Sequence, residues 1–264
     1  MNFLQTIMAI LFFIVPVIMI AGLMKRFGQK LDFYENIMTS TFSVLISAIL
    51  YLLLYRWVSG RSAFDVLWDG IRSLFVNDAV NTDRILSVYH QWGFFENFTT
   101  AEQLADFMIS QLKQTVPAVI ILWSLIYGIV LFLIIRFVMK KLGLAVPVVR
   151  PFEYWALPKG MALGLLVLLL VSFFGAGLGI KNFEIVQITI TALISFLFTI
   201  VGLSVIWYFL KAGNIPAVLR WIIIILIYLF FGFVVPILGL LDQLFHMRMN
   251  YRNKFLFKNG SNRS

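Results

Sequence analysis

The sequence has no cysteine and few charged residues. Only 12% of its 264 residues are charged, about half the share found in soluble domains. The lack of cysteine excludes a disulfide scaffold, a thiolate metal site and a cysteine nucleophile. The low charge excludes a soluble globular domain, a disordered chain and a coiled coil, because each of these needs far more polar surface.

Common enzyme motifs are also missing. There is no phosphate-binding loop, no His-Glu-x-x-His and no Gly-x-Ser-x-Gly. No charged residue lies deep inside an apolar run, which argues against a proton pump, a voltage sensor or a charged substrate at the middle of a membrane. We therefore expect no catalytic residues, no metal and no cofactor.

What the sequence does have is long apolar runs. Hydrophobic residues make up 61% of the chain, and the mean hydropathy is +0.95. Runs of roughly 18 or more apolar residues cross a hydrocarbon core as helices, because a lone strand in lipid leaves its backbone unpaired. We find six: Phe3–Met24, Ile37–Tyr55, Thr115–Val138, Gly160–Ile180, Ile185–Leu210 and Trp221–Leu241. The expected fold is all-α, a polytopic transmembrane bundle of about six helices.

One sizeable polar segment separates the second run from the third. Residues 56–114 hold five basic and seven acidic residues, with apolar side chains at helical spacing on both sides of a polar turn near 77–82. This pattern predicts two amphipathic helices outside the membrane. They form either a packed cap or a lid over a binding site. The expected division is 1–55, a first helix pair; 56–114, this segment; 115–245, four further membrane helices; and 246–264, a basic tail.

Basic residues give conflicting evidence on orientation. Short loops after the first, third and fifth runs are rich in lysine and arginine, which places them in the cytoplasm. With six crossings the C-terminal tail lies on the other side, yet it is also basic. Pro236 and two glycines lie near the end of the sixth run, so that run either crosses or breaks and re-enters. The residues concerned are Lys25, Arg26, Lys30, Arg136, Lys140, Lys141, Arg150, Lys159, Lys211 and Arg220 in the loops, and Arg248, Arg252, Lys254, Lys258 and Arg263 in the tail.

Polar residues form a stripe on one apolar run. Gln187, Thr191, Ser195 and Thr199 recur every four residues, and Thr41 and Ser43 belong to a looser cluster on the second run. Such residues either pack against neighbouring helices or line a polar path. The two sets are candidates for facing each other. Glycines at 160 and 164, and at 175 and 179, are spaced to permit close helix approach.

Two ionisable residues stand four apart at the end of the sixth run. Asp242 and His246 share a face if the helix continues, and such a pair relays a proton or contributes to a metal site. The alternative is that Asp242 lies at the membrane interface and pairs with Arg248 or Arg252.

Three segments resemble a known family. Pro151-Phe-Glu-Tyr-Trp-Ala-Leu-Pro158 places Tyr154 and Trp155 as interfacial anchors, and Phe198–Lys211 and Gly239-Leu-Leu-Asp242 with Arg248 follow. Together they resemble the YybS-like family of bacterial integral membrane proteins, a domain of unknown function. That family is distantly similar to substrate-binding subunits of energy-coupling-factor transporters, which work with separate ATPase modules.

The resemblance implies a multi-pass protein of the bacterial plasma membrane. We expect a non-enzymatic subunit that binds a small molecule or takes part in transport, with the polar stripe as lining and 56–114 as cap. The alternative is a scaffold or regulatory partner of another membrane or envelope protein. Expected partners are the lipid bilayer, a membrane protein or an ATPase module, and a small-molecule ligand, with no nucleic acid.

Overall fold

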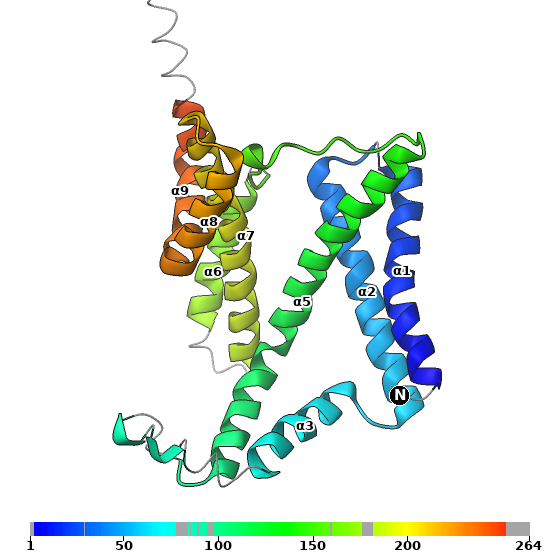
Figure 1. The fold of residues 1–264 in the computed structure, drawn as a ribbon, viewed down its shortest axis with the longest axis vertical. Coiled ribbons are helices and arrows are strands. Elements are labelled where there is room, and N and C mark those ends of the chain that lie inside the picture. Colours follow the sequence, from blue (N-terminus) through cyan, green and yellow to red (C-terminus); the bar gives the residue numbers. More distant parts are fainter. Residues whose placement is uncertain are drawn as a thin grey trace, which may run out of the picture. The chain divides into compact units, whose positions relative to one another are not determined.

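A computed structural model describes residues 3–28, 30–77, 84, 86–88, 90–93, 98–158, 160–175 and 182–251. Within these residues the chain forms helices and loops, and no strand. The all-α fold expected from the sequence is thus confirmed. The chain divides into two compact units (Figure 1), which are described one at a time. Unit 1 is 1–31 with 35–147, and unit 2 is 32–34 with 148–264.

Unit 1 includes the helices α1 (Phe3–Phe27), α2 (Phe33–Ser59), α3 (Ala63–Asn77) and α5 (Ala101–Lys141). The first amphipathic helix of the polar segment is present as α3. The second is continuous with the third membrane run, because α5 is a single helix of 41 residues. Thr100 caps α5, with its side chain accepting a hydrogen bond from the Gln103 amide. The expected division at 114/115 therefore falls inside a helix, and Pro117 lies within it.

In unit 1, α3 packs on the first turns of α5. Arg72 on α3 forms ion pairs with Glu102 at 3.1 Å and Asp106 at 3.2 Å, both on α5. The Lys113 ammonium lies 6.0 Å from the centre of the Trp68 ring. These contacts pack α3 against the start of α5. Whether the segment is a cap or a lid stays a prediction. Residues 78–82 of the expected turn lie outside the described residues.

Unit 2 contains the short 3₁₀ helix η1 (Phe152–Tyr154) and the helices α6 (Met161–Gly175), α7 (Phe183–Ala212), α8 (Ala217–Phe231) and α9 (Val234–Phe245). The bundle is built around α7, which α6, α8, α9 and η1 all contact. A cluster of Ala162, Leu165, Ile194 and Phe198 forms its apolar core. Figure 1 shows α8 and α9 lying beside each other against α7.

Among the described residues, four helices are long and apolar enough to cross a membrane: Ile10–Phe27 of α1, α2, Glu102–Lys141 of α5, and α7. The number is five if α8 (Ala217–Phe231) and α9 (Val234–Phe245) together form one bent span, against the six expected. Only 17% to 33% of the most apolar part of each span is buried. Apolar side chains therefore cover the outside of both units, as expected when lipid is the solvent. The fourth run forms the shorter α6, followed by residues 176–181 outside the described part of the chain.

The sixth run differs from a single straight span. It consists of α8 and α9, which are bent by 109° at Gly232–Phe233. At 1.5 Å per residue, α8 is about 22 Å long and α9 about 18 Å, and both are shorter than a hydrocarbon core of about 30 Å. The alternative of a break, suggested by Pro236 and the glycines, therefore describes this segment better than one crossing.

Both open ends of the α8–α9 pair lie at the same end of α7. At the start of α8, Arg220 and Trp221 contact Trp207 of α7. Beyond the end of α9, Arg248 contacts Ser204, and its carbonyl lies 3.5 Å from the hydroxyl of Tyr208. The pair is thus folded back on itself as a hairpin, with both open ends beside the C-terminal end of α7. Its tip lies near the middle of α7, because Tyr228 and Leu229 line the same groove as Ser195.

The close contact of α9 with α7 depends on two glycines. A Cβ atom on Gly202 would overlap the carbonyl oxygen of Val235, and one on Gly239 would overlap that of Phe198 and lie 2.8 Å from the Gly202 nitrogen. The two backbones are therefore in direct contact at this crossing. By contrast, a Cβ on Gly164 meets nothing within 4 Å, and the same holds for Gly160.

Candidate functional site

Arg248 is the centre of a buried polar cluster in unit 2. Its side chain is 10% exposed and that of Asp242 is 4% exposed. The guanidinium donates to Asp242 Oδ2 from Nε at 3.0 Å and from Nη2 at 2.7 Å. It also donates to the carbonyl oxygens of Glu153 at 2.7 Å and Trp155 at 3.1 Å, and to Ser204 Oγ at 2.9 Å. All three guanidinium nitrogens thus have acceptors.

The end of α9 places Arg248 opposite Asp242. His246 ends the helix with a left-handed φ of 52°, and its amide donates to the Asp242 carbonyl at 2.9 Å. The reversed chain then brings the Arg248 amide to 3.2 Å from Asp242 Oδ1. His246 itself is exposed. The sequence left two interpretations of Asp242, a functional pair with His246 and an ion pair with an arginine. The structure contains the ion pair, and its partner is Arg248.

A second ion pair adjoins the first. Lys211, at the end of α7, donates to Glu153 Oε1 at 2.5 Å. Burial raises the pKa of Glu153, but the hydrogen bond and charge of Lys211, with the charge of Arg220, outweigh it and leave the pKa below its usual range. Glu153 is therefore ionised at neutral pH. We call Glu153, Ser204, Lys211, Asp242 and Arg248 the polar clamp.

The polar clamp joins three segments that are far apart in the sequence. Ser204 on α7 donates to the carbonyls of Phe152 at 2.7 Å and Trp155 at 3.0 Å, and Arg248 caps the carbonyls of the same loop. A buried ion pair is tolerated when such additional hydrogen bonds satisfy its remaining groups. Because most of its buried donors and acceptors bond one another, the clamp holds these segments in a fixed geometry. Within the described residues, no group of three or more His, Asp or Glu is placed to hold a metal ion.

Arg220 stands apart from this network. Its guanidinium lies over the Trp207 ring, with Cζ 4.5 Å from the ring centre, and Trp207 in turn contacts Trp221. Its Nε is buried without a hydrogen-bond partner among the described residues. Arg220 therefore brings an unsatisfied donor to the rim of the bundle.

An open groove runs between α7 and α8. Its volume is about 490 Å³ and its wall is mostly apolar, within the usual range of about 300–1,000 Å³ for ligand sites. The lining residues are Ser195, Phe196, Thr199, Ile200, Leu203, Ile224, Ile225, Tyr228 and Leu229. We call this the α7–α8 groove.

The residues of the predicted polar stripe have different surroundings. Ser195 and Thr199 line the α7–α8 groove, and the Thr199 hydroxyl donates to the Ser195 carbonyl at 2.7 Å. Gln187 is half-buried and Thr191 is exposed on the same helix. Thus two of the four line a groove, and the structure assigns no ligand to any of them.

Thr41 and Ser43 belong to unit 1. Their hydroxyls donate to carbonyls of their own helix, Ile37 and Thr39, each at 2.9 Å. A Cβ on Gly128 of α5 would lie 2.9 Å from the Thr41 Cα, so α2 and α5 pack closely here. These contacts are those of a packed helix pair. Whether these residues face those of α7 stays a prediction, because the units are described one at a time.

The two predicted interfacial anchors have different environments. Tyr154 is exposed and its ring contacts that of Tyr208. The Trp155 indole donates to the Arg150 carbonyl at 2.9 Å, and its ring packs on Phe33. The carbonyl of Trp155 is an acceptor in the clamp region. The anchoring role itself stays a prediction.

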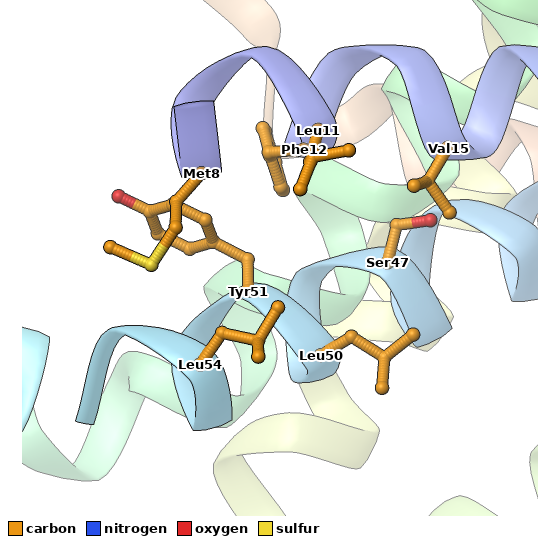
Figure 2. A pocket seen from close by; sticks show the side chains of 8 residues that line it. All are labelled: Met8, Leu11, Phe12, Val15, Ser47, Leu50, Tyr51 and Leu54. Atoms are coloured by element: carbon orange, nitrogen blue, oxygen red, sulfur yellow. The ribbon is translucent and has the colours of Figure 1, made fainter. Parts of the chain in front are cut away.

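Unit 1 has a smaller pocket between α1 and α2. Figure 2 shows eight side chains from the two helices around a space of about 150 Å³. They are Met8, Leu11, Phe12, Val15, Ser47, Leu50, Tyr51 and Leu54. The Ser47 hydroxyl already donates to the Ser43 carbonyl at 2.8 Å. This pocket is small and apolar, so it offers little to orient a polar ligand.

Sequence reasoning considered Asp242 with Arg248 but missed Glu153, Ser204 and Lys211 as their neighbours. The available signal was the resemblance, because the three segments that carry it are those that meet in the polar clamp.

Comparison with protein families gives one finding. The model of a family described as predicted membrane protein (DUF2232) matches residues 1–243. No curated protein and no solved structure matches the chain.

Proposed function

Because the chain belongs to this family of predicted membrane proteins, we propose that it is a non-enzymatic, multi-pass subunit of the bacterial plasma membrane that binds a small amphipathic molecule in the α7–α8 groove. The groove is the observation that carries the proposal. It combines an apolar wall with the hydroxyls of Ser195, Thr199 and Tyr228. A few polar groups in an apolar site orient a ligand without dominating its binding.

The polar clamp supports this proposal because it holds α7, which forms one wall of the groove, in a fixed position. Lys211 and Ser204 hold the end of α7 to the loop at 152–155, and Arg248 holds the end of α9 to the same loop. Half-depth helices beside a long helix are also a feature of transporter binding sites. A transport-related role with a separate ATPase module is therefore part of the proposal, supported further by the resemblance to the YybS-like family.

Orientation follows from the basic residues. If the hairpin enters and leaves on one side, the tail from Arg248 lies on the same side as Lys211, Arg220 and the loop at 142–160. The conflict within the sequence then disappears, because the basic loops and the basic tail share one side. We place that side in the cytoplasm.

Thermal unfolding of the full chain in mild detergent, against a panel of amphipathic small molecules and lipids, tests the proposal. A ligand at about a hundred times its Kd should stabilise the protein by about 2.7 kcal/mol. Ile225→Trp, which fills the groove, should remove this effect. Ile222→Trp is the matched control, because Ile222 is on the same helix, is 48% exposed against 54% for Ile225, and does not line the groove. The proposal fails if every ligand stabilises both variants and the original chain alike.

A membrane scaffold is the second candidate. The exposed Thr191, on the same stripe as Gln187 and Ser195, favours it, since polar side chains on membrane helices commonly bond a neighbouring helix. A scaffold predicts that a stable membrane partner co-purifies and that Thr191→Leu weakens this association while Ile225→Trp leaves it intact.

A further inference from the structure

The mouth of the α7–α8 groove carries an unbalanced positive charge. Arg220 precedes the groove residue Ile224 by one helical turn, and Trp207 follows the groove residue Leu203 by one turn. Residues four apart share a helix face. The stacked pair of Arg220 and Trp207 therefore stands over one end of the groove, with the tip of the hairpin at the other end.

Two other cations nearby, Lys211 and Arg248, are paired with carboxylates. Asp242 pairs with Arg248 at 2.7 Å, and Glu153 pairs with Lys211 at 2.5 Å. Within the described residues, no carboxylate lies within 4.0 Å of the Arg220 guanidinium, although Arg220 does contribute to the low pKa of Glu153. With both pairs counted as neutral, Arg220 adds an unpaired positive charge at this end of the bundle, in addition to that of the exposed Arg150.

We expect the Arg220 end of the α7–α8 groove to lie at the depth of the lipid headgroups. Tryptophans gather at the boundary between hydrocarbon and headgroups, and Trp207 and Trp221 are both here. An arginine at this depth extends toward the headgroups while its stem covers apolar surface. The buried Nε without a partner offers one N–H, and the guanidinium matches the geometry of a phosphate.

We propose that the α7–α8 groove binds an anionic phospholipid of the membrane, with an acyl chain along Leu203, Ile224 and Ile225 and the phosphate on Arg220. This inference deepens the proposed function and rests on it. Charge complementarity selects the occupant, because a neutral amphiphile could accept a hydrogen bond from Arg220 but would leave its positive charge unbalanced. The membrane supplies such lipids at the depth where the groove opens.

Native mass spectrometry of the purified full chain in mild detergent tests the inference. Phosphatidylglycerol is compared with diacylglycerol of the same acyl chains, which lacks the phosphate. Phosphatidylglycerol should bind about five- to tenfold more tightly, as expected for one cation at the headgroup. Arg220→Gln should remove most of this preference, and Arg220→Lys should keep part of it.

Lys140→Gln is the matched control, because Lys140 is an exposed cation in the last turn of α5 and does not line the groove. An equal loss of preference in Lys140→Gln would overturn the inference in favour of general attraction to basic residues. If phosphatidylglycerol and diacylglycerol bound equally well and Ile225→Trp blocked both, the phosphate site at Arg220 would be overturned. The proposal that the groove binds an amphipathic molecule would still stand. Binding of neither lipid would count against this inference, and the ligand panel would then decide the proposed function separately.

Discussion

The two units satisfy their polar groups in different ways. In unit 1 the buried hydroxyls of Ser40, Ser43 and Ser47 bond carbonyls of their own helix, and its ion pairs between α3 and α5 are exposed. In unit 2, besides the local pair of Asp242 and Arg248, Ser204 and Arg248 bond segments that are 44 to 95 residues apart in the sequence. Unit 1 is therefore held mainly by packing, whereas the geometry of unit 2 depends on a few long-range bonds.

The largest expected effect concerns the side of the membrane on which the two ends of the α8–α9 hairpin lie. A cysteine is labelled from one side of the membrane or it is not, so the result is all or none. The chain has no cysteine, so single cysteines can be introduced as reporters. Asn250→Cys beyond α9 and Lys140→Cys at the end of α5 should react with a membrane-impermeant maleimide from the same side. Ser73→Cys on α3 of unit 1 should react from the opposite side. Labelling of Asn250→Cys together with Ser73→Cys would mean that α8 and α9 cross the membrane.

Removing the buried ion pair of Arg248 and Asp242 in unit 2 should lower the unfolding free energy far more than removing an exposed ion pair in unit 1. Arg248→Ala leaves the carboxylate of Asp242 buried without its partner, at a cost of about 3–5 kcal/mol in unfolding free energy. Arg72→Ala removes exposed ion pairs from unit 1 and should cost about 0–1 kcal/mol. Reversible unfolding in mixed detergent, followed by tryptophan fluorescence, measures both. Similar losses in the two variants would contradict the contrast drawn between the units.

The glycine crossing should give an intermediate effect. Gly239→Ala inserts a methyl group between two backbones in contact and should cost about 1–3 kcal/mol. Gly164→Ala meets open space inside a helix and should be neutral or stabilising by up to about 1 kcal/mol. The same unfolding assay measures both variants. If Gly164→Ala were destabilised and Gly239→Ala unchanged, the close backbone contact would not be at Gly239.

The sequence predicted the fold class well because apolar length and helical spacing are local properties. The runs at the first, second, third and fifth positions became α1, α2, α5 and α7. The polar segment was only half predictable. Its spacing identified α3 and the helical character of residues 104–112, but we divided that second helix from the next apolar run, whereas both belong to α5. Without a glycine between Ala101 and Lys113, the chain had no reason to break there.

The candidate site was harder to predict because it depends on contacts between distant segments. Spacing placed Asp242 and His246 on one face, but the left-handed turn at His246 directs the chain to Arg248 instead. The glycine pattern selected residues 160, 164, 175 and 179. A Cβ on Gly160 or Gly164 meets open space and one on Gly175 meets the Phe183 ring, while residue 179 lies outside the described part of the chain; the backbone contact occurs at Gly202 and Gly239. Which glycine meets a backbone depends on the neighbouring helix, and a single helix sequence does not contain that information.

The polar clamp also sets an order of events during biosynthesis. The ribosome makes Glu153 and Ser204 well before it makes Arg248, which is 95 residues after Glu153. Until Arg248 emerges, the carbonyls of Glu153 and Trp155 lack their guanidinium donor and the hairpin has no fastening at its end. The nascent chain therefore contains α6 and α7 before the donor that holds the end of α9 exists, so a ribosome stalled before Arg248 would leave α9 without this attachment.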